Sequence, residues 1–120
     1  MVAVVTGGSG SLGQTMVRRL LESGLTTVVL DMRAPEPQFL EDIGTSAKRL
    51  KFVSTNLFDE DSVRDAIGQA ATFGPLEALI NLAGGFRFGP GVEQMELADW
   101  ESMITLNATS AFLSIKHSLP

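Results

Sequence analysis

Residues 2–13 read Val-Ala-Val-Val-Thr-Gly-Gly-Ser-Gly-Ser-Leu-Gly, and this stretch decides the fold. The run from Met1 to Val5 is apolar and rich in valine, which predicts a strand buried on both faces. From Thr6 to Gly13, four of eight residues are glycine, which predicts a sharp turn. Apolar residues then recur at helical spacing, so an amphipathic helix is expected directly after the turn. The apolar stripe consists of Leu12, Met16, Val17, Leu20 and Leu21.

A strand, a glycine-rich turn and a helix in direct succession form the phosphate-binding start of a Rossmann unit. Glycines let the backbone approach a ligand closely, and a helix N-terminus offers unpaired N–H groups to a diphosphate. The next apolar run ends in Asp31, eighteen residues beyond Gly13, where this fingerprint places a carboxylate for a ribose. A plain tight turn followed by a solvated loop aspartate is the alternative.

The rest of the chain alternates strand and helix signals without an internal repeat or domain boundary. Right-handed crossovers between such elements predict a single α/β domain over residues 1–120, a Rossmann-type doubly wound parallel sheet with strand order 3-2-1-4. The later strands are expected at residues 26–31, 50–54 and 76–83, and the later helices at residues 39–43, from Asp59 onward, and at about 98–117.

The composition of the chain argues against several classes of protein. Apolar residues make up 44% of the chain, but no run is long enough to cross a bilayer, and no basic leader precedes the first strand. A net charge of −5 argues against a nucleic-acid partner. With no cysteine, one histidine and scattered carboxylates, no disulfide and no metal site are expected. These features favour a soluble, cytoplasmic domain with no membrane partner.

A glycine-rich loop over residues 84–91 follows the fourth expected strand, at the sheet edge where ligands bind in open α/β folds. Phe86 and Phe88 in this loop either line a substrate pocket or pin the loop to the surface. The last expected helix carries Asn107 on an apolar stripe, and a buried amide there requires a hydrogen-bond partner. The stripe consists of Trp100, Met103, Ile104, Asn107, Ala108, Ala111, Phe112 and Ile115.

Several motifs in the correct order resemble those of the short-chain dehydrogenase/reductase (SDR) family, and the match spans the whole chain. Thr6-Gly7-x-x-Gly10-x-x-Gly13 resembles the glycine motif, and residues 73–84 resemble the segment that ends in Asn-Asn-Ala-Gly. Asp99-Trp100, Leu106-Asn107 and residues 116–120 resemble the family's fourth long helix. There are two departures: the glycine spacing is typical of the extended, epimerase-like branch, with Ser11 where the short branch has glycine, and Leu82 replaces the second asparagine.

The resemblance implies a nicotinamide dinucleotide site. Asp31 is expected to accept hydrogen bonds from the adenosine ribose, which favours NAD, while Arg33 leaves NADP open as an alternative. Asn56 and Leu57 take the place of an Asp-Val pair beside the adenine. Ala83 and Gly84 are expected near the nicotinamide-side ribose. The residues expected around the diphosphate are Gly7, Ser9, Gly10, Ser11, Leu12 and Gly13.

Asn107 resembles the helix asparagine of the family's Asn-Ser-Tyr-Lys catalytic set. The resemblance implies a helix break at Asn107 whose freed carbonyl holds a water in a proton relay; the alternative is an amide tied to neighbouring backbone. The family transfers a hydride between nicotinamide and a carbonyl or alcohol carbon, with a tyrosine as general acid/base. This sequence contains no tyrosine.

The resemblance therefore implies that the chain is the amino-terminal, cofactor-binding part of an SDR oxidoreductase, truncated before the fifth strand and expected to be inactive by itself. A non-catalytic dinucleotide-binding sensor or partner module is the alternative, and an epimerase-like sugar-nucleotide enzyme is a third hypothesis based only on the glycine spacing. The substrate is not predicted. An unpaired edge on the fourth strand, or the last helix, through which relatives often pair, is expected to support a homo-oligomer.

Overall fold

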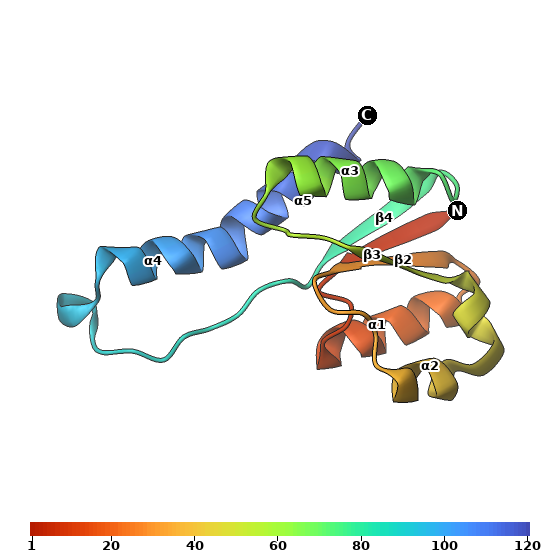
Figure 1. Ribbon diagram of the computed structural model, residues 1–120, viewed down its shortest axis with the longest axis horizontal. Helices are drawn as coiled ribbons and strands as arrows, with labels where there is room; N and C mark the ends of the chain where they lie inside the picture. The colour runs from red at the N-terminus through yellow and green to blue at the C-terminus, as the bar shows by residue number, and fades with distance from the viewer.

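The computed structural model describes residues 1–120, which form a four-stranded parallel sheet in the order β3-β2-β1-β4 between two layers of helices (Figure 1). This confirms the predicted doubly wound fold and its strand order. The strands are β1 (Val2–Thr6), β2 (Thr26–Asp31), β3 (Leu50–Ser54) and β4 (Leu76–Asn81). The helices are α1 (Ser11–Glu22), α2 (Pro37–Ile43), α3 (Glu60–Ala71), α4 (Leu97–Ile104) and α5 (Ser110–Ser118), with 3-10 turns at Gly44–Arg49 and Val92–Gln94 and a π segment at Thr105–Thr109.

The central strand β1 is buried along its whole length, as its valine-rich sequence predicts. It pairs in parallel with β2 on one side and β4 on the other, so that Thr6 lies opposite both Leu30 and Asn81. Since all four strands are parallel, their carboxyl ends meet at one edge of the sheet, and the turns that follow β1, β2 and β4 lie side by side there.

Alternate residues of the strands form two apolar layers, one on each face of the sheet. Val4 and Leu30 face α3 and α5, where Val63 and Leu113 complete one core cluster. On the opposite face, Val5 and Val29 pack against Val17 and Leu21 of α1 and against Phe39 of α2. Burying each such side chain contributes about 1.5–3 kcal/mol, so the sheet is anchored from both sides.

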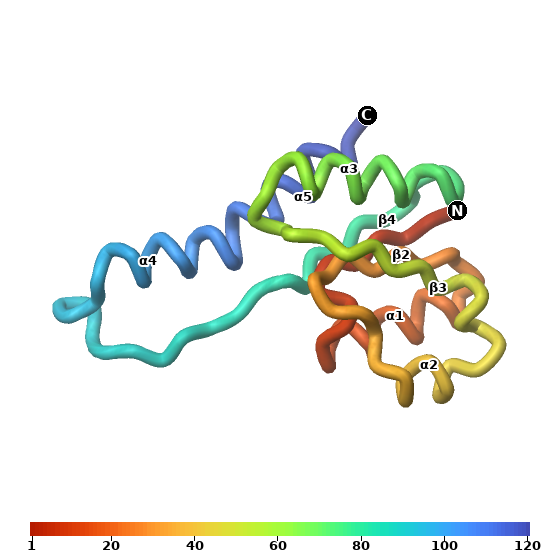
Figure 2. The backbone as a smooth tube through the Cα atoms, viewed as in Figure 1, coloured from red at the N-terminus to blue at the C-terminus, as the bar shows by residue number.

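The last helix differs from the single apolar helix expected at about residues 98–117. Helix α5 packs against α3 and β4 through Ser110, Leu113 and Ser114. Helix α4 instead projects from the body together with the loop before it, as an arm (Figure 2). The expected stripe is therefore largely exposed: the apolar periodicity marks a face of the helix, but Trp100, Phe112 and others on it do not pack on this sheet.

Strand β4 forms one edge of the sheet, because it pairs only with β1, and β3 forms the other. Strand β4 is half-buried and ends at Asn81, two residues before the expected end. A groove of about 460 Å³ runs along this edge, between β4 and the end of the chain after α5. The expected unpaired edge is thus present.

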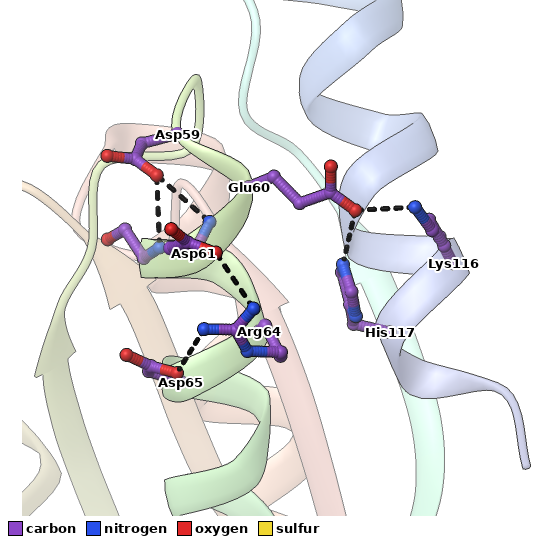
Figure 3. Close-up of polar contacts among 8 residues, drawn as sticks. Asp59, Glu60, Asp61, Arg64, Asp65, Lys116 and His117 are labelled. Carbon is purple, nitrogen blue, oxygen red and sulfur yellow. Dashed lines mark hydrogen bonds and ion pairs between the residues drawn. The ribbon is translucent and has the colours of Figure 1, made fainter.

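Helix α3 begins as its sequence predicts. The Asp59 carboxylate accepts hydrogen bonds from the backbone N–H groups of Asp61 (2.9 Å) and Ser62 (3.3 Å), which caps the helix. The next residue, Glu60, joins α3 to the last turn of α5: its Oε1 accepts from Lys116 Nζ at 2.5 Å and lies 3.0 Å from His117 Nε2 (Figure 3). The hydrogen bond from Lys116, followed by that from His117, lowers the pKa of Glu60.

The lowered pKa of Glu60 predicts a specific loss of stability in acid. A carboxyl group whose pKa is lower in the folded state than its ordinary value of 4.5 stabilises the fold above that value, and the contribution is lost as pH falls through the lowered folded pKa. The melting temperature, measured between about pH 7 and pH 3, should therefore fall less steeply with decreasing pH for Glu60→Gln than for the wild type. Glu101→Gln, an exposed change on α4, serves as control, and equal slopes for Glu60→Gln and wild type would contradict the prediction.

Candidate dinucleotide-binding site

The glycine turn between β1 and α1 doubles back on itself within four residues. Gly7 adopts a left-handed φ of 68°, and its N–H donates to the Leu30 carbonyl at 3.0 Å. Gly10 is the N-cap of α1, and its carbonyl accepts the first intrahelical bond from Gln14 N–H at 2.8 Å. The N–H groups of the residues between them, Ser11, Leu12 and Gly13, have no backbone partner and are free to bind an anion.

Three glycines of the turn are required by the packing of the chain itself. A Cβ on Gly13 would lie 2.3 Å from the Gly7 carbonyl oxygen, and one on Gly7 would lie 2.8 Å from Ala83 N. One on Gly8, which is not among the predicted cofactor-binding residues, would lie 2.7 Å from the Val29 side chain. Gly10 differs, because a Cβ there would meet only the Gly7 oxygen at 3.6 Å. The free space in front of Gly10 is therefore available to a ligand.

A groove of about 380 Å³ opens at this position. It brings together seven of the predicted cofactor-binding residues, while Ser9, Ser11, Leu12, Gly13 and Asn56 do not line it. The wall also includes Met32, Phe58, Leu82 and Leu106, none of which was among the predicted cofactor-binding residues. The seven predicted residues are Gly7, Gly10, Asp31, Arg33, Leu57, Ala83 and Gly84.

Asp31 stands at the end of β2, where the fingerprint places it, and lines the groove. Its Oδ2 accepts from Ser9 N–H at 3.2 Å and its Oδ1 from Arg33 N–H at 3.3 Å. The Ser9 hydroxyl donates to the Arg33 carbonyl at 2.7 Å. The carboxylate is thus held between the glycine turn and the loop after β2.

Asn56 and Leu57 stabilise the turn between β3 and α3. Asn56 Oδ1 accepts from Phe58 N–H at 3.1 Å, and its own N–H donates to Ser62 Oγ at 2.9 Å. Leu57 is buried in the core cluster against α3 and also reaches the groove. Between them they fix the turn that carries Phe58, which is about half exposed.

The ends of β1 and β4 are tied by Thr6. Its hydroxyl donates to Asn81 Oδ1 at 3.3 Å and accepts from Ala83 N–H at 3.3 Å, and its carbonyl accepts from Leu82 N–H at 3.2 Å. Leu82, the departure from the Asn-Asn-Ala-Gly pattern, packs against the apolar cluster under α1. An apolar side chain therefore replaces an amide at this point without leaving a polar group unpaired.

Asn107 lies in the π segment, where the helix changes its hydrogen-bond spacing without breaking, and its side chain is exposed and not buried as expected. Its amide makes a two-way contact with the loop after β4: Oδ1 accepts from Gly85 N–H at 3.0 Å, and Nδ2 donates to the Gly85 carbonyl at 2.9 Å. Nδ2 also donates to the Met103 carbonyl at 3.1 Å within the helix. A Cβ on Gly84 would lie 2.7 Å from Asn107 Oδ1, so this glycine permits the contact.

The rest of the loop after β4 stands away from the body of the protein. Phe86 and Phe88 are 78% and 90% exposed and pack edge-to-face on one another, with ring centroids 4.8 Å apart. Neither ring lines the groove or packs on the sheet. An ion pair of 2.6 Å between Arg87 and Asp99 joins the loop to α4.

Two further features bear on the type of site. The structure contains no cluster of three or more His, Cys, Asp or Glu side chains that could hold a metal ion. None of its helices combines the length and the apolar character needed to span a membrane.

A parallel sheet, a glycine turn at the start of a helix and an aspartate at the end of the next strand define a Rossmann domain. The chain belongs to the short-chain dehydrogenase family, whose model matches residues 1–120. It is 31% identical over 121 residues to 2,5-dichloro-2,5-cyclohexadiene-1,4-diol dehydrogenase LinX of Sphingobium indicum, covering 99% of this chain and 48% of the relative. Cis-4-hydroxycyclohexanecarboxylate dehydrogenase of Sinomonas cyclohexanicum is 31% identical over 119 residues, which cover 98% of this chain and 48% of that protein.

Solved structures show the same fold. A short-chain dehydrogenase/reductase from Serratia marcescens superimposes with a TM-score of 0.81 and 28% identity, over 98% of this chain and 49% of its own. The NADP-bound structure of ElxO gives a TM-score of 0.88 at 19% identity, over 98% of this chain and 48% of its own. The chain thus spans about half the length of the relatives it matches.

The contrast between Gly13 and Gly10 predicts different effects on stability. Gly13→Ala forces a methyl group into the Gly7 carbonyl, so it should destabilise the fold by about 1–3 kcal/mol or more. Gly10→Ala meets only an ordinary contact and should change the free energy of unfolding by less than about 1 kcal/mol. Urea denaturation of both variants measures this, and equal losses would show that the turn does not pack as described.

Proposed function

We propose that residues 1–120 bind a nicotinamide dinucleotide for an oxidoreductase that transfers a hydride between the nicotinamide and a carbonyl or alcohol carbon. The observation that carries this proposal is the free space at Gly10, which opens into the same groove as the Asp31 carboxylate. The packing of the chain would allow a side chain at position 10, so the glycine there is explained by a ligand that approaches the backbone. Membership of the short-chain dehydrogenase family supports the same conclusion.

The donors at the start of α1 fit the diphosphate. The three free N–H groups of Ser11, Leu12 and Gly13 lie at the positive end of the helix dipole, where an anion is stabilised. Asp31, at the far side of the groove from β4, suits the hydroxyl groups of a ribose. Ala83 and Gly84, which follow β4, line the other end of the groove, where the nicotinamide half of the coenzyme would bind.

The coenzyme supplies the hydride chemistry when it is bound, and these residues supply binding and orientation. The family's proton-transferring tyrosine has no counterpart among residues 1–120, because the sequence contains no tyrosine. Asn107 acts here as a positioning residue: its contacts with Gly85 hold the loop that begins at the nicotinamide end of the groove. Its backbone carbonyl in the π segment remains the candidate for a water in a proton relay.

For the coenzyme, we favour NAD because the Asp31 carboxylate would repel a 2′-phosphate. Arg33 also lines the groove and forms no ion pair, which keeps NADP as the second candidate; NADP is also the ligand in the ElxO structure. A non-catalytic sensor or partner module would use the same groove. The two functions differ in whether the whole protein oxidises or reduces a substrate when it binds the coenzyme.

The identity of the ribose-binding residue predicts coenzyme preference. Asp31→Ala removes both the acceptor for the ribose hydroxyls and the repulsion of a 2′-phosphate, so NAD affinity should fall about tenfold while NADP affinity holds or rises. Calorimetry with NAD and NADP on wild type and variant measures the ratio. Asp65→Ala, an exposed change on α3, is the control. An unchanged ratio in Asp31→Ala would remove Asp31 from the site.

Gly10→Ala tests the free space itself. The added methyl group would occupy the place of the diphosphate, so the variant should keep its fold and lose at least about tenfold in affinity for NAD. Calorimetry and a thermal melt on the same sample separate the two effects. Binding at wild-type strength would show that no ligand approaches the backbone at Gly10.

We also propose that copies of the chain associate, either through the exposed apolar face of the last helix or through the β4 edge. Four large apolar side chains of α4 and α5 are between 42% and 59% exposed: Trp100, Ile104, Phe112 and Ile115. Exposed apolar patches of this kind commonly mark interfaces. Sedimentation velocity should show an oligomer that Phe112→Glu dissociates; an oligomer that survives the change points to the β4 edge, and a wild-type monomer refutes association.

A further inference from the structure

Ser9 lies in the middle of the glycine turn, yet none of its polar groups points into the groove. Its N–H donates to Asp31 Oδ2 at 3.2 Å, and its hydroxyl donates to the Arg33 carbonyl at 2.7 Å. Its carbonyl accepts from Gln14 Nε2 at 3.3 Å. Ser9 therefore connects the turn after β1 to the loop after β2, instead of offering these groups to a diphosphate.

These contacts close a ring around Asp31. Oδ1 of the carboxylate accepts from Arg33 N–H at 3.3 Å, while the Arg33 carbonyl is held by the Ser9 hydroxyl. The carboxylate is thus bonded to both loops, and each oxygen keeps a lone pair for a further donor. Because Asp31 lines the groove, those lone pairs are available to a ligand there.

We propose that Ser9 is a positioning residue that sets the preference for a free ribose diol over a 2′-phosphate, by holding the Asp31 carboxylate and the Arg33 backbone in fixed relation. The inference rests on the proposed function, since it concerns the selectivity of that same groove. Two vicinal hydroxyl groups donate best to a carboxylate that is already oriented, because no further ordering cost is incurred on binding.

The same ring of bonds disfavours a phosphate. A carboxylate fixed by two backbone donors cannot turn away from a second negative charge. The Arg33 side chain is the one cation that lines the groove, and the segment that carries it is held back by the Ser9 hydroxyl. Loss of that hydroxyl frees residues 31–33, so the carboxylate orients less well toward a diol and the guanidinium can approach a phosphate.

The test uses Ser9→Ala, which removes the hydroxyl and keeps the backbone N–H, and Ser9→Thr, which restores a hydroxyl. The control is Ser23→Ala at the other end of α1, where an exposed serine hydroxyl also donates to a backbone carbonyl at 2.7 Å. Calorimetry on the full chain gives the Kd values of NAD and NADP for each variant. Ser9→Ala should lower the ratio of the NADP Kd to the NAD Kd by about fivefold or more.

Ser9→Thr should recover the wild-type ratio within about twofold, and Ser23→Ala should leave it unchanged. A merely structural role for Ser9 would lower the melting temperature and weaken both coenzymes equally. An unchanged ratio in Ser9→Ala, with NAD still bound by the wild type, would overturn the inference and leave the proposed function intact. If the wild type binds neither coenzyme, the proposed function fails, and the inference fails with it.

Discussion

The backbone of the turn after β1 passes so close to its own neighbours that three successive requirements for glycine fall within seven residues. Gly7 lies against Ala83, Gly8 against Val29, and Gly13 against the Gly7 carbonyl. These approaches bring the start of α1 down onto the sheet and place its free N–H groups at the carboxyl edge. The other parts of the candidate site lie around this closely packed turn.

The parallel register then decides which other residues reach the site. Thr6 pairs with Leu30 and Asn81, so the last residues of the flanking strands end beside it. Asp31 is the next residue on one side, and Ala83 comes two residues later on the other. The groove is therefore bounded by segments that are distant in sequence and that meet at the carboxyl edge of the sheet.

Local patterns were enough to predict the sheet, α1 and the start of α3, because each depends on its own sequence. The valine run of β1 and the Asp59 cap form as expected, and α1 buries Val17 and Leu21 of its expected stripe but leaves Leu12 exposed. The exposure of Phe112 and the partners of Ser9 could not be predicted in this way. The first depends on where α5 meets α3, and the second on a loop 24 residues away. Leu82 shows the same limit, since its motif calls for an amide but its position faces the apolar cluster under α1.

Glycine alone does not distinguish a residue that the fold needs from one that a ligand needs, and the structure separates the two. A Cβ on Gly84 would lie 2.7 Å from the Asn107 amide oxygen, so the lack of a side chain at Gly84 permits the contact between the loop after β4 and the π segment. Gly10 has no such neighbour. At the N-cap of a helix, serine, threonine, asparagine or aspartate would stabilise the helix through a side-chain bond that Gly10 cannot make. A position that forgoes this stabilisation, with room for the side chain that would supply it, is better explained by an occupant of the groove than by the stability of the fold.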